Sequence, residues 1–79
     1  MTLSDQALSI LAFAAYHQLE SGDVVSEVVL DDGQGHKASA AGLAELEQAG
    51  LLVPDGSRGK FSEAGTARLQ SIVDAVKNA

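Results

Sequence analysis

The residues with the clearest chemical potential form a glycine-rich segment near the middle of the chain. It reads Gly33-Gln34-Gly35-His36-Lys37-Ala38, a G-x-G-x-x-A pattern that follows a valine-rich run and precedes a predicted helix. In dinucleotide-binding folds such a turn lets the backbone approach a pyrophosphate. Here the residues that follow predict a helix and a hairpin rather than parallel strands, and Asp31 and Asp32 would repel phosphate. We therefore interpret the segment as a loop.

The histidines, carboxylates and serines of the sequence give little support for metal binding or covalent catalysis. Cysteine is absent, which excludes a thiolate zinc site and a cysteine nucleophile. His17 and His36, the two histidines, do not have the H-x-x-x-H spacing of a metal pair. The Asp31-Asp32-Gly33 segment lacks the further carboxylates of a calcium loop, and no nucleophile elbow surrounds a serine. We expect no metal, no cofactor and no enzyme activity.

Length and charge bound the class of protein. The chain has 79 residues, which allows one domain over residues 1–79. Its formal net charge of −6 excludes a generally basic nucleic-acid coat and a polybasic membrane binder. The longest uncharged run, Gln6 to Leu19, is too short to span a bilayer, and no basic, apolar, cleavable segment opens the chain. We expect a soluble cytoplasmic protein.

Helical periodicity and end signals predict three longer helices. The first is apolar at Leu8, Leu11, Ala12, Ala15 and Leu19, with Ser4 or Asp5 as its cap and Ser21-Gly22 at its end. The predicted ranges are 5–20, 37–49 and 63–77, the second ended by Gly50 and the third capped by Ser62. The first helix is apolar over more than one face, which is typical of a helix wrapped by its own domain or shared with a partner.

Between the helices, two short segments predict a hairpin and one is ambiguous. Residues 51–53 and 60–62 have the pattern of short strands, joined by a turn over residues 54–59. Residues 23–30 contain four valines that fit a helix and also fit a buried strand. We favour a short helix there, and a strand remains the alternative. Residues 31–35 then form a loop.

Two segments resemble parts of winged-helix regulators. Leu43-Ala44-Glu45-Leu46-Glu47-Gln48-Ala49-Gly50-Leu51-Leu52 resembles the end of a recognition helix and its exit, where a leucine and three further residues are followed by Gly-Leu. Phe61-Ser62-Glu63-Ala64-Gly65 resembles the L-T-E-x-G segment after the wing in regulators of the multiple-antibiotic-resistance (MarR) type. The resemblance covers about residues 38–73. It implies a mainly α fold with a small β-hairpin: a three-helix core, a wing and a C-terminal helix.

The charges divide unevenly along the chain. Residues 1–36 carry six acids and neither Lys nor Arg, whereas residues 37–79 carry five bases and five acids. The resemblance places Lys37 and Ser39 near the start of the recognition helix and Arg58 and Lys60 on the wing, where such residues contact DNA phosphates. The predicted recognition helix itself has no Arg, and no Asn or Gln before Gln48, whereas direct base reading needs Arg, Lys, Asn or Gln aimed into the groove.

Two functions follow from these patterns. The first is a small DNA-binding protein in transcriptional regulation, a homodimer through its first or last helix, with Lys37, Ser39, Arg58 and Lys60 on the DNA backbone. The alternative is an acidic domain for protein interaction, with Asp23, Glu27, Asp31 and Asp32 facing a basic partner. A positive wing face would support DNA binding. Pairing of Lys37, Arg58 and Lys60 with acids would support the protein partner.

Overall fold

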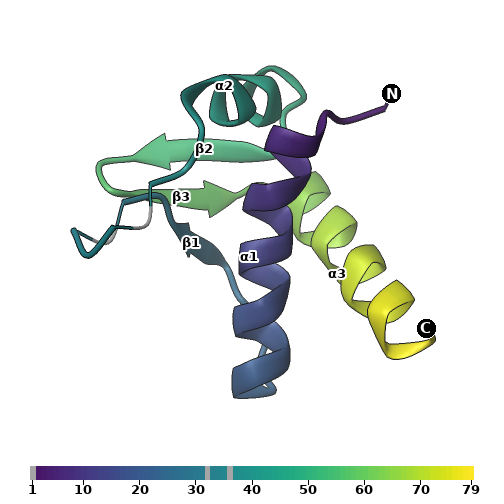
Figure 1. Cartoon of the computed structure of the whole chain (residues 1–79). Helices are drawn as coiled ribbons and strands as arrows, with labels where there is room; N and C mark the ends of the chain where they lie inside the picture. Colours follow the sequence, from purple (N-terminus) through teal and green to yellow (C-terminus); the bar gives the residue numbers. More distant parts are fainter. Residues whose placement is uncertain (1, 32, 36) are drawn as a thin grey trace.

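The computed structural model describes residues 2–31, 33–35 and 37–79. These residues form three α-helices and one three-stranded antiparallel sheet. In chain order the elements are α1 (Asp5–Ser21), β1 (Glu27–Val29), α2 (Ala40–Gln48), β2 (Leu52–Asp55), β3 (Arg58–Phe61) and α3 (Glu63–Lys77). Figure 1 shows α1 between the sheet and α3, with α2 across the N-terminal end of α1. The fold is therefore a small mixed α/β arrangement.

Each of these helices begins after a serine. The side-chain oxygen of the serine accepts a hydrogen bond from a backbone N–H three residues later, which satisfies a donor that the first helical turn leaves unpaired. The pairs are Ser4 with Ala7, Ser39 with Gly42 and Ser62 with Gly65. The structure thus selects Ser4 over Asp5 as the first cap and confirms Ser62 as the last. It also confirms the predicted bounds of α3.

The second helix begins later than predicted. Lys37 and Ala38 were expected in its first turn, but they continue an extended segment instead. Lys37 forms an isolated antiparallel bridge with Asp31, and the Ala38 N–H donates to the Leu30 carbonyl at 2.7 Å. These contacts close the base of the predicted loop, so α2 starts only at Ala40.

The prediction of a short helix over residues 23–30 is wrong, because this segment contains strand β1. β1 pairs antiparallel with β3, and Val28 lies opposite Gly59. Val28 is buried while Glu27 and Val29 on either side are partly exposed, which is the two-residue alternation of a strand. The predicted mainly α fold with four helices and a lone hairpin is therefore corrected to three helices and three strands, within the part of the chain that the structure describes.

The predicted hairpin is present with a tighter turn. Residues 54 and 55, expected in the turn, extend β2, so that only Gly56 and Ser57 connect the strands. Gly56 has a φ of +64°, as a type II′ turn requires at its first central position. Pro54 is tolerated because β2 is an edge strand. The short turn fixes the register in which Asp55 lies opposite Arg58.

The core is aliphatic, as the scarcity of aromatic residues predicts. Its largest fully buried side chains are Leu11, Leu46, Leu52, Leu69 and Val73. The core face of α1 differs from the predicted one, because Leu11 and Ala15 are buried whereas Leu8, Ala12 and Leu19 are exposed. Ala7, Ile10, Ala14 and Gln18 complete the buried face of this helix. The small alanines allow α1 to lie close to its neighbours.

The junction between β2 and α3 requires a glycine. A Cβ at Gly65 would overlap the carbonyl oxygen of Leu51 and would crowd the Phe61 ring. The same Leu51 oxygen accepts a hydrogen bond from the Ser62 N–H at 3.0 Å, and the Ser62 hydroxyl donates to the Gly50 carbonyl. The first turn of α3 is therefore held directly against the backbone at the start of the hairpin.

Substitution of Gly65 by alanine tests this close approach. Alanine is the better helix former by about 1 kcal/mol, so Gly65→Ala would stabilise α3 if space were available. We expect instead a net loss of about 2 kcal/mol in the free energy of unfolding, because the backbone must move apart. Urea unfolding measures the change, and Ser71→Ala on the exposed side of α3 is the control. A Gly65→Ala variant as stable as the wild type would contradict the packing.

Candidate functional site

The outer face of the sheet carries both bases of the predicted wing. Arg58 and Lys60 are two residues apart on β3, so their side chains project from the same face, while Gly59 between them is buried. In the register of the sheet, Glu27 and Val53 flank Lys60, and Val29 and Asp55 flank Arg58. This surface, which we call the sheet face, consists of Glu27, Val29, Val53, Asp55, Arg58 and Lys60.

Both bases of the sheet face form ion pairs with acids of the neighbouring strands. Arg58 Nη1 lies 3.6 Å from Glu27 Oε1, and Lys60 Nζ lies 3.6 Å from Asp55 Oδ2. The side chains of Arg58 and Lys60 are each 59% exposed, and an exposed pair contributes only about 0–1 kcal/mol to stability. The two ion pairs matter for the electrostatic potential of the surface. Two positive and two negative charges alternate on the sheet face, which is therefore locally neutral.

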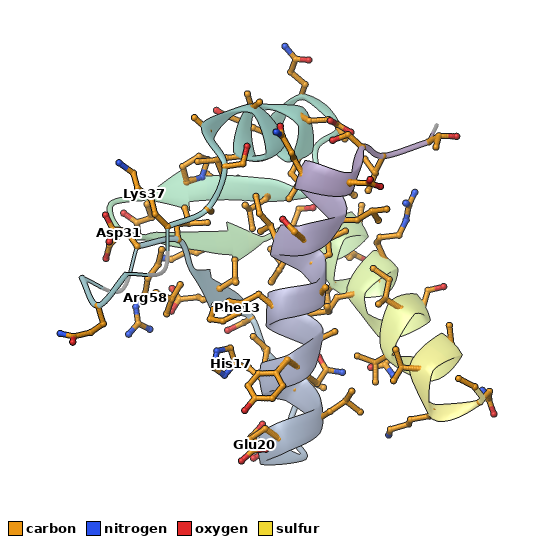
Figure 2. The ribbon with its side chains drawn as sticks, viewed as in Figure 1. Phe13, His17, Glu20, Asp31, Lys37 and Arg58 are labelled. Carbon is orange, nitrogen blue, oxygen red and sulfur yellow. The ribbon has the colours of Figure 1, made fainter. Side chains whose placement is uncertain are left out.

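Lys37 and Asp31 lie beside the sheet face, on the loop that follows β1. The N–H groups of Leu30 and Asp31 donate to the Ser57 carbonyl at 2.7 and 3.2 Å, which holds the loop against the hairpin turn. Figure 2 shows Asp31, Lys37 and Arg58 at the same end of the molecule. The predicted basic and acidic surfaces are therefore interleaved there. Asp32 and His36 lie outside the described residues.

The remaining predicted site residues, Ser39 and Asp23, lie away from the sheet face. Ser39 caps α2, and its side-chain oxygen accepts from the Gly42 N–H at 3.2 Å. Asp23 lies at the opposite end of α1 from the α2 contact, beside a groove of roughly 170 Å³ between the C-terminal parts of α1 and α3. The groove is lined by Gln18, Leu19, Gly22, Asp23, Val24, Gln70, Val73 and Lys77. Asp23 thus does not join Glu27 and Asp31 in one acidic surface.

A buried glutamine supports the wall of this groove. Gln18 is 8% exposed; its side-chain Nε2 donates to Gln70 Oε1 at 3.1 Å, and its Oε1 accepts from the Val25 N–H at 3.3 Å. Gln18 therefore ties α1 both to α3 and to the segment that leads into β1. These contacts help to position Leu19 and Val24, which both line the groove.

Two features of the sheet face were missed by sequence reasoning. Asp55 was placed in a turn, and no partner was assigned to Lys60. A two-residue turn at Gly56 and Ser57 would have put Asp55 on β2 opposite Arg58, and alternation would have put it on the face of Val53. The pairing of Glu27 with Arg58 had no local signal, because it depends on the assignment of β1 as a strand.

The described residues of the glycine-rich segment and His17 are not brought together into a reactive centre. The glycines of the G-x-G-x-x-A segment have positive φ, but α2 begins only at Ala40, so they do not open a helix directly. His17 packs edge-on against Phe13 and Tyr16, with ring centroids 4.6 and 5.3 Å apart. Among the described residues, no three His, Asp or Glu side chains are grouped so that they could hold a metal ion.

Comparisons with known proteins identify no relative of the chain. Protein-family profiles, curated proteins and solved structures all give no match. Within the residues that the structure covers, no helix combines the length and apolarity needed to cross a membrane. The functional inference therefore rests on the surfaces of this chain.

One carboxylate outside the sheet face has a perturbed pKa. The Ser4 hydroxyl donates to Glu45 Oε1 at 2.6 Å, and the Ser4 N–H donates to Glu45 Oε2 at 2.8 Å. These two hydrogen bonds favour the ionised carboxylate and lower the pKa of Glu45. They tie α2 to the residue that caps α1, and so they help to position the helix that follows Lys37 and Ser39.

The lowered pKa of Glu45 predicts a pH-dependent contribution to stability. A depressed native pKa adds stability above the unfolded-state pKa, and this stability is lost as the pH falls through the native value. We expect Glu45→Gln to be less stable than the wild type at pH 7, with a difference that shrinks at pH values below the native pKa. Urea unfolding at pH 7 and in acid measures it. Glu47→Gln controls for the removal of one charge from α2. A difference that does not depend on pH would contradict the Ser4–Glu45 contact.

Proposed function

We propose that this chain is a small winged-helix-like domain that binds another protein, and that its hairpin is not a DNA-binding wing. The observation that carries this proposal is the pairing of both hairpin bases with acids of the same sheet, Arg58 with Glu27 and Lys60 with Asp55. A surface that holds alternating charges has little net attraction for a polyanion. It is well suited to a protein surface with its own mixed charges.

The winged-helix part of the proposal is supported by the order of the elements. A helix before the β2–β3 hairpin and a helix after it are what the resemblance implies, and β1 on the other edge of β3 is an addition to that pattern. The contact of Gly65 and Ser62 with the Leu51 carbonyl gives the two resembling segments a common physical role. One departure matters: among the described residues between β1 and α2, there is no helix. The helix-turn-helix of such regulators is therefore incomplete here.

The residues of α2 also favour a protein partner. The helix contains no Lys or Arg, and its exposed positions hold alanines, one glutamate and one glutamine: Ala40, Ala41, Ala44, Glu47 and Gln48. Direct readout of bases uses long donor side chains near the start of a recognition helix, whereas Gln48 is the last residue of α2, and a glutamate facing DNA is repelled by phosphates. A surface rich in alanine is instead compatible with close packing against a partner.

DNA binding is the second candidate, because Lys37, Arg58 and Lys60 do lie at one end of the fold. The ion pairs of Arg58 and Lys60 are exposed and weak, so phosphates at low salt can compete with the carboxylates. Each phosphate neutralised adds about 0.9 to the slope of log affinity against log salt. DNA binding by this surface must therefore be salt-dependent.

A charge-neutralising pair of substitutions separates the two candidates. NMR titration of labelled protein with a mixed-sequence duplex is expected to give no shifts at Lys37, Arg58 or Lys60 at physiological salt. Glu27→Gln with Asp55→Asn frees both bases, and this variant should gain salt-sensitive shifts on β3 at low salt. The matched control, Glu20→Gln with Asp23→Asn, makes the same charge change away from the sheet and should gain none. Wild-type shifts on β3 and at Lys37 that weaken with salt would favour DNA binding and contradict the proposal.

A further inference from the structure

A band of exposed apolar side chains runs along the outward face of α1. Tyr16 is 58% exposed, Leu8 is 41% exposed and Leu19 is 39% exposed, and Ala12 between them is also exposed. These positions are spaced by three or four residues, so they share one side of the helix. We call this set, Leu8, Ala12, Tyr16 and Leu19, the α1 stripe. At 1.5 Å per residue it extends for about 16 Å, or three turns.

The α1 stripe ends at the groove between α1 and α3. Leu19 belongs to both, and it lines the groove with Val24 and Val73. Val24 is 67% exposed, and Val76, next to the groove residue Lys77, is 52% exposed. The groove volume of roughly 170 Å³ corresponds to about six water molecules at about 30 Å³ each. It therefore has room for one large side chain from a partner.

Acidic side chains flank this apolar surface. Asp5 precedes Leu8 by three residues and Glu20 follows Tyr16 by four, so both lie along the stripe. Asp23 lines the groove. From α3, Lys77 lines the groove, and the Asp74 carboxylate accepts a hydrogen bond at 2.9 Å from the side chain of the groove residue Gln70. Figure 2 shows Glu20 below His17 at the C-terminal end of α1.

We infer that the α1 stripe and its groove bind an amphipathic helix of a partner protein, with apolar side chains on one face and Lys or Arg on its flanks. This inference rests on the proposed protein-binding function and specifies its surface and partner. An apolar stripe of about three turns matches the helix-in-groove mode of recognition. A central tyrosine is a typical anchor of such an interface. The partner's apolar face covers the stripe, and one of its large side chains enters the groove.

Charge complementarity selects a basic partner over the other possible occupants. The stripe and groove carry Asp5, Glu20 and Asp23, with Asp74 beside the groove residue Gln70, against one base, Lys77, among the residues described there. A second copy packed α1 against α1 would bring acids against acids, because residues 1–36 contain no Lys or Arg. A nucleic acid would be repelled for the same reason. Lysine or arginine on the flanks of a partner helix satisfies the acids.

The test is an NMR titration of the labelled full chain with a synthetic peptide of leucine and lysine. The peptide has about 18 residues, or five helical turns, with its leucines on one face. Shifts are expected along α1 from Leu8 to Val24 and at Val73 to Lys77, and they should weaken as salt is raised. A scrambled peptide of the same composition should bind about tenfold more weakly. The same design with glutamate in place of lysine should not bind.

A matched pair of substitutions locates the binding. Ala12→Lys places a charge in the middle of the α1 stripe, and it should weaken binding of the leucine–lysine peptide by about tenfold or more. Ala64→Lys makes the same change at an exposed alanine in the first turn of α3, at the other end of this helix from the groove, and should leave the affinity within about twofold of the wild type. Urea unfolding of both variants checks that the fold is retained. Equal effects of the two substitutions would overturn the assignment of the surface.

Some outcomes would overturn the assignment of the α1 stripe without contradicting the proposed protein-binding function. Peptide shifts centred on Glu27 and Asp55 would overturn the stripe while leaving protein binding in place. A dimer of the chain alone in sedimentation, converted to a monomer by Ala12→Lys, would assign the stripe to a second copy and overturn the basic partner. Absence of shifts with every peptide would also overturn the inference of a basic partner helix. Salt-sensitive duplex binding at Arg58 and Lys60 would instead contradict the proposed function.

Discussion

The pairing of β1 with β3 is the interaction on which the surface of this protein depends. It places Glu27 within reach of Arg58, and it brings Leu30 and Asp31 against the Ser57 carbonyl at the hairpin turn. The glycine-rich loop therefore lies beside the hairpin instead of leading directly into a helix. Because β3 is central, its two bases stand between the acids of two neighbouring strands. One backbone pairing thus sets both the topology and the charge balance of this end of the fold.

Local signals in the sequence predict the ends of α1 and α3 and the hairpin, but not the start of α2. Serine caps, Gly22 and the short strands around Gly56 are each determined by a few neighbouring residues, and the structure contains them. The strand β1 was missed because four valines within eight residues fit both periods, and the free edge of β3 that decides between them is distant in sequence. The core face of α1 was misassigned because apolar residues surround the helix. Packing of Ala7, Ala14 and Ala15 against the other elements, rather than periodicity, selects the buried side.

The ion pairs of the candidate site could not be predicted for a related reason. They join residues on different strands, so they depend on the register that the Gly56–Ser57 turn and the β1–β3 pairing establish. The acids of residues 1–36 and the bases of residues 37–79 were predicted to lie on separate surfaces. At the sheet they lie on the same surface instead. On α1 the acids remain separate from the bases of the hairpin, and Asp5, Glu20 and Asp23 lie along an exposed apolar stripe. The two ends of the molecule therefore differ: one is neutral and polar, the other is acidic and apolar.

Acids neutralise the bases of the hairpin in this protein, while the α1 surface stays negative. The near-surface electrostatic potential measures this directly, residue by residue, from the NMR relaxation enhancements of matched cationic and anionic paramagnetic co-solutes. We expect a potential near zero around Arg58 and Lys60 and a clearly negative potential along α1 at Asp5, Glu20 and Asp23. A positive potential that extends over Lys37, Arg58 and Lys60 would contradict the account, because the hairpin would then present the field of a DNA-binding surface.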